Sequence, residues 1–144
     1  GEMFSGVINE GAHMLREDLV SGKVTSDKAI TVRPPPKEGL VVVASKSHSN
    51  SDKLDNFLQN YKVSKLTKRG SSLKICTIAA GKADLYPRLG PTCEWDTAAA
   101  HAVLKAAGGE ILDFHGEQLT YGHPSRKFLN PEFIALSDIS LYQK

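Results

Sequence analysis

Apolar residues in this chain gather in short runs separated by glycine, proline and serine. Residues 40–44 are apolar without a break, which is typical of a strand buried on both faces. Residues 52–61 and 73–80 predict helices, and the second leaves so little polar surface that we expect it to lie between two layers. Further strands are predicted over residues 3–8, 12–16, 63–66, 83–86, 110–113, 119–121 and 133–136, with a weaker, polar one over 24–32.

A third helix is predicted from about Thr92, as its N-cap, to a glycine stop at residues 108–109. Two stripes are expected on it, an apolar one formed by Ala99, Ala100, Val103, Leu104 and Ala107 and a polar one formed by Thr97, His101 and Lys105. Asp96 heads the apolar stripe beside Trp95, where a carboxylate is costly unless a cation or several donors face it. The alternative is that Asp96 only complements the helix dipole, which is worth about 0.3–1 kcal/mol.

The order of these elements determines the predicted fold class. Strands alternate with helices along most of the chain, which favours a layered α/β sandwich. The turn at residues 9–11 predicts a hairpin, and we expect this hairpin to add to a larger sheet because an isolated one is marginal in water. Three consecutive prolines within residues 33–39 predict a stiff connector.

Composition narrows the class of protein. The chain has 144 residues, of which 40% are hydrophobic and 24% are charged, which suffices for one globular domain with a core. Its formal net charge of +2 gives no reason to expect nucleic acid as a partner. No apolar run approaches the roughly 18–20 residues of a membrane-spanning helix, and the first residues lack a signal-peptide pattern. Cys76 and Cys93 lack metal-site spacing and indicate a reducing cytoplasm.

Polar residues gather at three junctions where a predicted strand leads into a helix, the place where open α/β folds collect ligands. The serine-rich segment 45–51 contains His48, either a ligand-binding or simply a solvated side chain. Residues 68–74 bring two serines and Lys74 to a helix start, which favours an anion site, with an ordinary serine N-cap as the alternative. The third junction carries Arg88, shortly before Asp96. Cations and a carboxylate near one face indicate a phosphate ester beside a divalent metal.

Five motifs, in order, give the chain a resemblance to a known family. Residues 70–74 read Gly-Ser-Ser-Leu-Lys, residues 81–88 read Gly-Lys-Ala-Asp-Leu-Tyr-Pro-Arg and residues 95–99 read Trp-Asp-Thr-Ala-Ala. Residues 45–48 and 129–133 fit as well. Over nearly its whole length the chain resembles the inositol-monophosphatase-like phosphatases, and within them the bacterial 3'(2'),5'-bisphosphate nucleotidases of the CysQ type.

The resemblance implies an enzyme that hydrolyses a phosphomonoester with Mg²⁺ and a metal-activated water. For the nucleotidase branch the small-molecule substrate is adenosine 3',5'-bisphosphate, which loses its 3'-phosphate to give AMP in sulfur assimilation and nucleotide recycling. Asp96 inherits the roles of metal ligand and catalytic residue at the substrate. The residues implied to line the nucleotide pocket are His48, Ser71 or its neighbour Ser72, Lys74 and Arg88.

The chain departs from the family pattern in one large respect. The family's other metal ligands lie in a Glu-Glu pair and an Asp-Pro-x-Asp-Gly-Thr loop of its N-terminal half, and neither occurs here. We therefore expect a fragment in which residues 1–36 are the end of the N-terminal lobe sheet and a connector, and residues 37–144 are the C-terminal α/β lobe. The missing half would be its partner and would supply the remaining Mg²⁺ ligands, because one carboxylate does not build a multi-metal site. The fragment alone is expected to be inactive.

Two other functions stay open. One is an inositol or sugar monophosphatase of the same superfamily. Arg88 argues against this function, because the inositol branch tends to carry an acidic residue at that position. The other is a non-catalytic nucleotide-binding module, which the missing carboxylates favour. We expect a cytoplasmic protein, with peripheral association at the inner membrane as an alternative.

Overall fold

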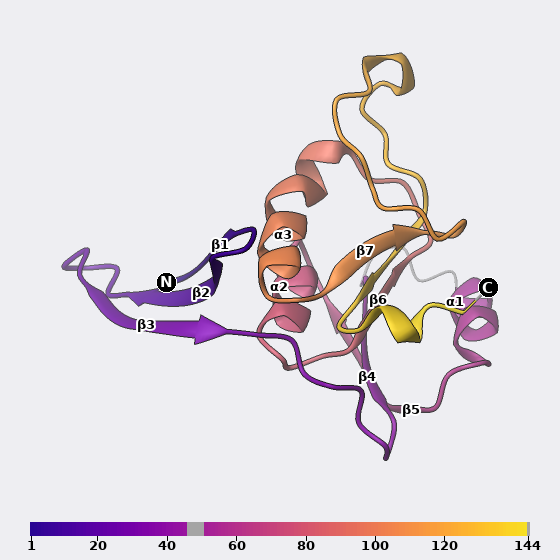
Figure 1. Ribbon diagram of the computed structural model, residues 1–144, viewed down its shortest axis with the longest axis horizontal. Helices are drawn as coiled ribbons and strands as arrows, with labels where there is room; N and C mark the ends of the chain where they lie inside the picture. The colour runs from indigo at the N-terminus through magenta and orange to yellow at the C-terminus, as the bar shows by residue number, and fades with distance from the viewer. Residues whose placement is uncertain (46–50, 144) are drawn as a thin grey trace.

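The computed structural model describes residues 1–45 and 51–143 (Figure 1). A three-stranded antiparallel sheet has the order β1-β2-β3, and a five-stranded mixed sheet has the order β5-β4-β6-β8-β7. In the larger sheet β4 is parallel to β5 and β6, whereas β8 is antiparallel to β6 and β7. The elements are β1 (Glu2–Val7), β2 (Gly11–Glu17), β3 (Val24–Ile30), β4 (Leu40–Ser45), α1 (Ser51–Leu58), β5 (Val63–Arg69), α2 (Leu73–Ala79), β6 (Leu85–Arg88), α3 (Glu94–Ala106), β7 (Glu110–Asp113), η1 (Pro124–Arg126), β8 (Phe133–Leu136) and η2 (Ile139–Leu141).

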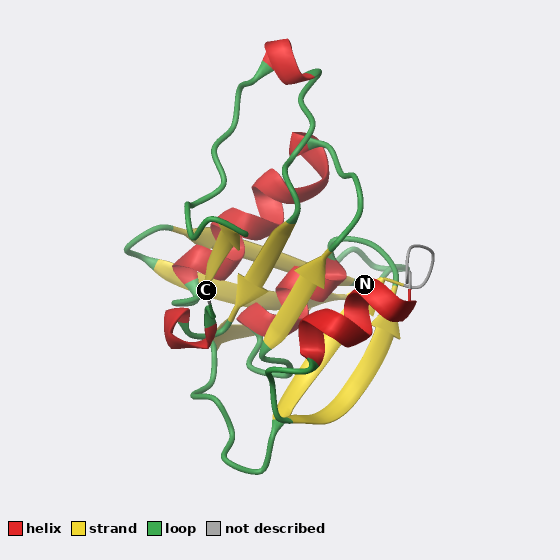
Figure 2. Cartoon of the chain, turned by 90° about the vertical axis from the view of Figure 1, so that its right-hand side faces the viewer, coloured by secondary structure: helices red, strands yellow, loops and turns green. Residues whose placement is uncertain are grey.

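Helices α2 and α3 lie between the two sheets, and α1 covers the outer face of the larger sheet (Figures 1 and 2). One apolar cluster joins α2 and α3 to one face of that sheet and to Ala12 of the small sheet. A second cluster on the opposite face joins the larger sheet to Phe57 and Leu58 of α1. The predicted α/β sandwich is confirmed. The division of the chain at residue 36 stays a prediction.

The small sheet approaches α3 most closely at Gly6. A Cβ atom on Gly6 would lie 2.8 Å from the Val103 Cα and 3.0 Å from the Ala106 Cβ, so only glycine fits. Ala12 and Met14 are buried and Val7 is 55% exposed. The predicted hairpin forms between β1 and β2, β3 extends it to a three-stranded sheet, and one face of this sheet packs onto α3.

Helix α3 differs from the prediction at its start and on its faces. Its N-cap is Cys93 rather than Thr92, while the predicted stop holds, with Gly108 at a φ of 98°. Ala100, Val103, Leu104 and Ala107 are buried as predicted. Asp96 and Ala99 are exposed, however, whereas Thr97 and His101 of the expected polar stripe are buried.

The segment between β7 and β8, residues 114–132, explains this difference. This β7–β8 loop projects from the larger sheet and carries η1 at its outer end (Figures 1 and 2). His101 contacts the hydroxyl of Tyr121 in this loop at 2.7 Å and Glu110 at 2.7 Å, so these partners satisfy its ring nitrogens. The strand predicted at 119–121 is wrong, because these residues join no sheet; the single bridge next to them is formed by Gln118 with Leu112.

No helix within residues 1–45 and 51–143 is both long and apolar enough to span a bilayer. Helix α2 lies between the sheets as predicted, although Leu73 at its start is 48% exposed. Helix α1 ends at Leu58 rather than at Tyr61.

Candidate functional site

A pocket of about 440 Å³ opens at one end of the larger sheet. Parallel strands β4, β5 and β6 all end there, and Arg88 of β6 pairs with Phe133 at the start of β8. The volume falls in the range of small-molecule sites, roughly 300–1,000 Å³. The structure thus brings together five of the six predicted site residues, which all line this pocket: Ser71, Ser72, Lys74, Arg88 and Asp96. The sixth, His48, lies outside the described residues.

Lys74 is a buried cation in this pocket. Its side chain is on α2, and the residue is only 3% exposed. The ammonium group donates to the carbonyl oxygens of Arg69 at 3.2 Å and Ser71 at 2.8 Å, and lies 5.1 Å from the ring centroid of Tyr86. Burial, and then the positive charge of Arg88, lower the pKa of Lys74 below its usual value. Two of its three donors are in use, so one stays available to a ligand.

Arg88 is the second buried cation, at the end of β6 and 9% exposed. Its Nε donates to the Gly90 carbonyl at 3.3 Å and its Nη2 to the Pro91 carbonyl at 2.9 Å. These two bonds use Nε and Nη2, and the side chain also interacts with Tyr86; the remaining guanidinium N–H groups can donate to an acceptor with two oxygens. Strand alternation places Tyr86 on the same face as Arg88, so the period-2 pattern of the sequence could have identified Tyr86 as a residue that lines the pocket.

Neither cation has an anionic partner in the described part of the chain. Lys74 and Arg88 form no ion pair within 4 Å there, and Asp96 is the single carboxylate among the described residues that line the pocket. A buried cation without a counter-charge is costly. An anionic ligand would supply that charge, and a phosphate group suits the remaining guanidinium N–H groups.

Asp96 has two uses for its carboxylate. Its Oδ2 accepts the backbone N–H of Cys93 at 2.8 Å, which forms a capping box at the start of α3. Asp96 therefore has a structural role at the start of α3, where the sequence suggested an interaction with the helix dipole as the alternative to a metal role. The other oxygen has no hydrogen bond within the described residues, and it remains able to coordinate a ligand.

The described residues do not make a complete metal centre. They contain no group of three or more His, Cys, Asp and Glu side chains that could hold a metal ion. The segment 46–50 adds His48 but no carboxylate to the sequence. Asp96 could contribute one oxygen to a divalent cation, but Mg²⁺ prefers an octahedral set of six oxygen ligands.

The two serines lie at the start of α2. Ser71 has a φ of 58°, in the left-handed region, and its hydroxyl oxygen accepts the Leu73 N–H at 3.4 Å. Ser72 occupies the N-cap position without a side-chain capping bond. Both serines line the pocket, and the geometry does not choose between them.

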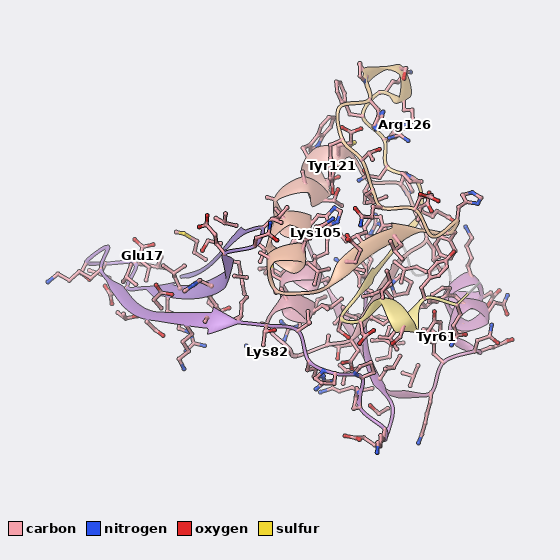
Figure 3. All side chains as sticks on the ribbon, viewed as in Figure 1. Glu17, Tyr61, Lys82, Lys105, Tyr121 and Arg126 are labelled. Atoms are coloured by element: carbon pink, nitrogen blue, oxygen red, sulfur yellow. The ribbon has the colours of Figure 1, made fainter. Side chains whose placement is uncertain are left out.

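Sequence reasoning missed the residues that hold the start of α3. Glu94 is 6% exposed, and its carboxylate accepts the backbone N–H groups of Gly122 at 2.6 Å and His123 at 3.1 Å. Arg126, on η1, lies 3.7 Å from the same carboxylate. Figure 3 shows Arg126 at the outer part of the β7–β8 loop and Tyr121 closer to α3. Glu94 therefore anchors the loop to the first turn of α3.

Asn130 completes this anchor from the other end of the loop. Its backbone N–H donates to the Thr92 carbonyl at 2.9 Å, and its Nδ2 donates to the Cys93 carbonyl at 2.9 Å and the Thr97 hydroxyl at 3.0 Å. The motif at 129–133 is visible in the sequence, but no local pattern indicates its partners, which lie more than 30 residues away. These bonds hold the helix turn that carries Asp96.

Comparison with known proteins shows the family of the chain. The model of the inositol monophosphatase family matches residues 1–136 of the chain. The chain belongs to this family. The CysQ structure from Bacteroides thetaiotaomicron, a bacterial member of the inositol monophosphatase family, aligns with a TM-score of 0.73 and 32% identity over 94% of this chain and 53% of its own.

Two curated proteins similar to this chain are named as CysQ nucleotidases. The 3'(2'),5'-bisphosphate nucleotidase CysQ of Salmonella typhimurium (strain LT2) is 48% identical over 101 residues, which is 70% of this chain and 38% of that protein. The CysQ of Buchnera aphidicola subsp. Acyrthosiphon pisum is 46% identical over 114 residues, which is 78% of this chain and 42% of that protein. The chain spans less than half the length of these two relatives.

Proposed function

We propose that this chain is the C-terminal, substrate-binding lobe of a phosphatase that removes the 3'-phosphate from adenosine 3',5'-bisphosphate. The observation that supports this most directly is the pair of buried cations, Lys74 and Arg88, without a carboxylate partner among the described residues. A bisphosphate nucleotide carries a second phosphate that is not hydrolysed and needs its own cations. The similarity to CysQ nucleotidases at 46–48% identity supports the same substrate class.

In this proposal the residues of the chain hold and orient the phosphates. The remaining N–H groups of the Arg88 guanidinium bind the 5'-phosphate through two hydrogen bonds, and the remaining Lys74 proton donates to the same group. A hydroxyl from Ser71 or Ser72 and the His48 ring add further contacts. A bound dianion would offset the repulsion between Lys74 and Arg88, and would therefore raise the pKa of Lys74 towards its ordinary value.

The metal part of the proposal rests on Asp96. One Asp96 oxygen would coordinate Mg²⁺, which, when bound, supplies an activated water for phosphate hydrolysis. The remaining ligands would come from the N-terminal half typical of the family, because the described residues provide a single carboxylate at the pocket. The 144-residue chain alone should therefore release no phosphate.

The cellular setting is proposed from the thiols. Cys76 and Cys93 are both free, and burial raises the pKa of Cys76 to about 11, so this thiol is unreactive. Free thiols support a cytoplasmic location, where sulfur assimilation and nucleotide recycling would use the reaction. Peripheral association with the inner membrane stays a prediction.

The test compares two substrates on the native protein, which in this proposal includes the N-terminal half typical of the family, with Mg²⁺ present. We expect kcat/KM for adenosine 3',5'-bisphosphate to exceed that for inositol 1-phosphate, which lacks a second phosphate for Arg88. A preference for inositol 1-phosphate would support the inositol or sugar monophosphatase alternative instead. Tight nucleotide binding without phosphate release would support the non-catalytic nucleotide-binding module.

A further inference from the structure

Trp95 combines exposure with a place in the pocket. It is the only tryptophan in the chain, it is 69% exposed, and it lines the pocket that holds Lys74 and Arg88. One helical turn further along α3 lie Ala98 and Ala99, whose small side chains cannot cover an indole ring. A large aromatic face beside a phosphate-binding region is therefore open to a ligand.

The indole ring is held by Phe128. The two ring centroids lie 6.0 Å apart with a 50° angle between the planes. Phe128 and the preceding Lys127 have φ values of 57° and 53°, in a region that is unfavourable for bulky side chains. The Phe128 carbonyl accepts the Glu94 N–H at 2.8 Å, so a main-chain bond fixes the loop against the first turn of α3. Phe128 thus limits how far the Trp95 ring can turn.

We propose that Trp95, supported by Phe128, is the surface on which the nucleobase of the substrate stacks. The inference rests on the proposed function and adds the recognition of the base to the recognition of the phosphates. A ligand with two phosphates and an aromatic base would satisfy both the buried cations and the exposed indole, whereas a sugar phosphate would leave the indole in water. Stacking tolerates any base, so the ligand class is nucleoside 3',5'-bisphosphates in general, with modest preference among bases.

Fluorescence tests the contact directly, because the emission that the native protein loses in the Trp95→Phe variant comes from Trp95. Both proteins, with EDTA present, are titrated with adenosine 3',5'-bisphosphate and with ribose 3,5-bisphosphate, which has no base. We expect quenching of the Trp95 emission by the nucleotide, little change with the base-free compound, and accessibility of Trp95 in the free protein to acrylamide. Equal responses to both compounds, or an indole already shielded from acrylamide, would overturn the inference.

Kinetics provides the second measurement. Trp95→Ala should raise KM for adenosine 3',5'-bisphosphate about 5- to 150-fold, the equivalent of losing one stacked base, and should hardly change KM for ribose 3,5-bisphosphate. Trp95→Phe should fall between wild type and Trp95→Ala, and Leu19→Ala, which removes an exposed apolar side chain remote from the pocket, should change neither constant. Equal KM changes on both substrates would contradict stacking.

The two proposals fail differently. A wild-type protein that hydrolyses both bisphosphates, with KM values that Trp95→Ala leaves unchanged, would keep the proposed function and refute the stacking surface. A protein that shows base-dependent quenching but releases no phosphate from any bisphosphate would keep the stacking surface and refute the proposed function.

Discussion

Arg33 forms a two-pronged salt bridge with Asp84, whose side chain is completely buried. Its Nε donates to Oδ1 at 2.8 Å and its Nη2 to Oδ2 at 2.7 Å. The same carboxylate accepts the backbone N–H of Val41 at 2.7 Å. The hydrogen bonds that Arg33 donates to Asp84 raise the pKa of Arg33 above its usual value. This pair fastens the proline-rich connector to the start of β4 and fixes where the small sheet joins the larger one.

Loss of Arg33 should therefore destabilise the protein strongly. Arg33→Ala leaves a buried carboxylate with one backbone donor, and we expect a loss of about 3 kcal/mol in the free energy of unfolding. The control is Arg16→Ala, which breaks the exposed pair with Glu2 and should cost less than about 1 kcal/mol. Urea denaturation of both variants measures the difference. Equal losses would mean that the buried pair adds nothing beyond a surface pair.

Asp96→Asn in the native protein should separate the metal role from the helix cap. The amide oxygen can still accept the Cys93 N–H, so stability should fall by at most about 1 kcal/mol. Removal of the charge should weaken Mg²⁺ binding and lower turnover sharply. Asp113→Asn is the matched control, since the Asp113 carboxylate likewise accepts backbone N–H groups, those of His115 and Glu117, but lies outside the pocket. Near-normal activity of Asp96→Asn at low Mg²⁺ would leave Asp96 as a cap residue only.

Arg88→Glu should affect substrates according to their second phosphate. Loss of a charge-assisted contact costs about 1.5–3 kcal/mol, or roughly one to two orders of magnitude in binding. We expect this mostly as a higher KM for adenosine 3',5'-bisphosphate, and a much smaller change for inositol 1-phosphate. Arg88 also holds the carbonyls of Gly90 and Pro91, so thermal stability is measured in parallel. Equal losses on both substrates would indicate a structural role alone.

Glu94→Ala should loosen the β7–β8 loop. It leaves the N–H groups of Gly122 and His123 without their acceptor, and we expect a loss of about 1–3 kcal/mol. Glu94→Gln keeps one acceptor oxygen and should lose less. Limited proteolysis within residues 114–132 gives a local readout. Unchanged cleavage in Glu94→Ala would show that Glu94 does not anchor the loop.

Glu110 should make stability depend on acidity. Burial would raise its pKa, but hydrogen bonds from His101, Ile111 N–H and Lys105 outweigh burial and lower the pKa below its ordinary value. A lowered carboxyl pKa contributes stability that is fully present above pH of about 4.5 and is lost as pH falls through the folded-state pKa. Glu110→Gln should remove this contribution. Urea denaturation between pH 7 and pH 3 should show a stability difference from wild type that shrinks towards acid.

The sequence by itself determined the local parts of this protein. Uninterrupted apolar residues predicted β4, the turn at residues 9–11 predicted the β1–β2 hairpin, and Gly108 predicted the end of α3. These signals succeed because each is carried by residues that are close together in the chain. An apolar run indicates a buried strand, and glycine or asparagine at one position sets the backbone angles of a turn or a helix stop. The motifs that resemble the family also indicated Lys74, Arg88 and Asp96 as neighbours, and they do line one pocket.

Only the tertiary structure decided which groups face each other across long sequence distances. It buried Thr97 and His101 under the β7–β8 loop and paired Arg33 with Asp84. No periodic pattern encodes these outcomes, because each depends on a partner 20 to 51 residues away in the chain. A polar side chain on a helix is buried when a distant segment supplies its hydrogen bonds, and that segment's position is a property of the packed fold.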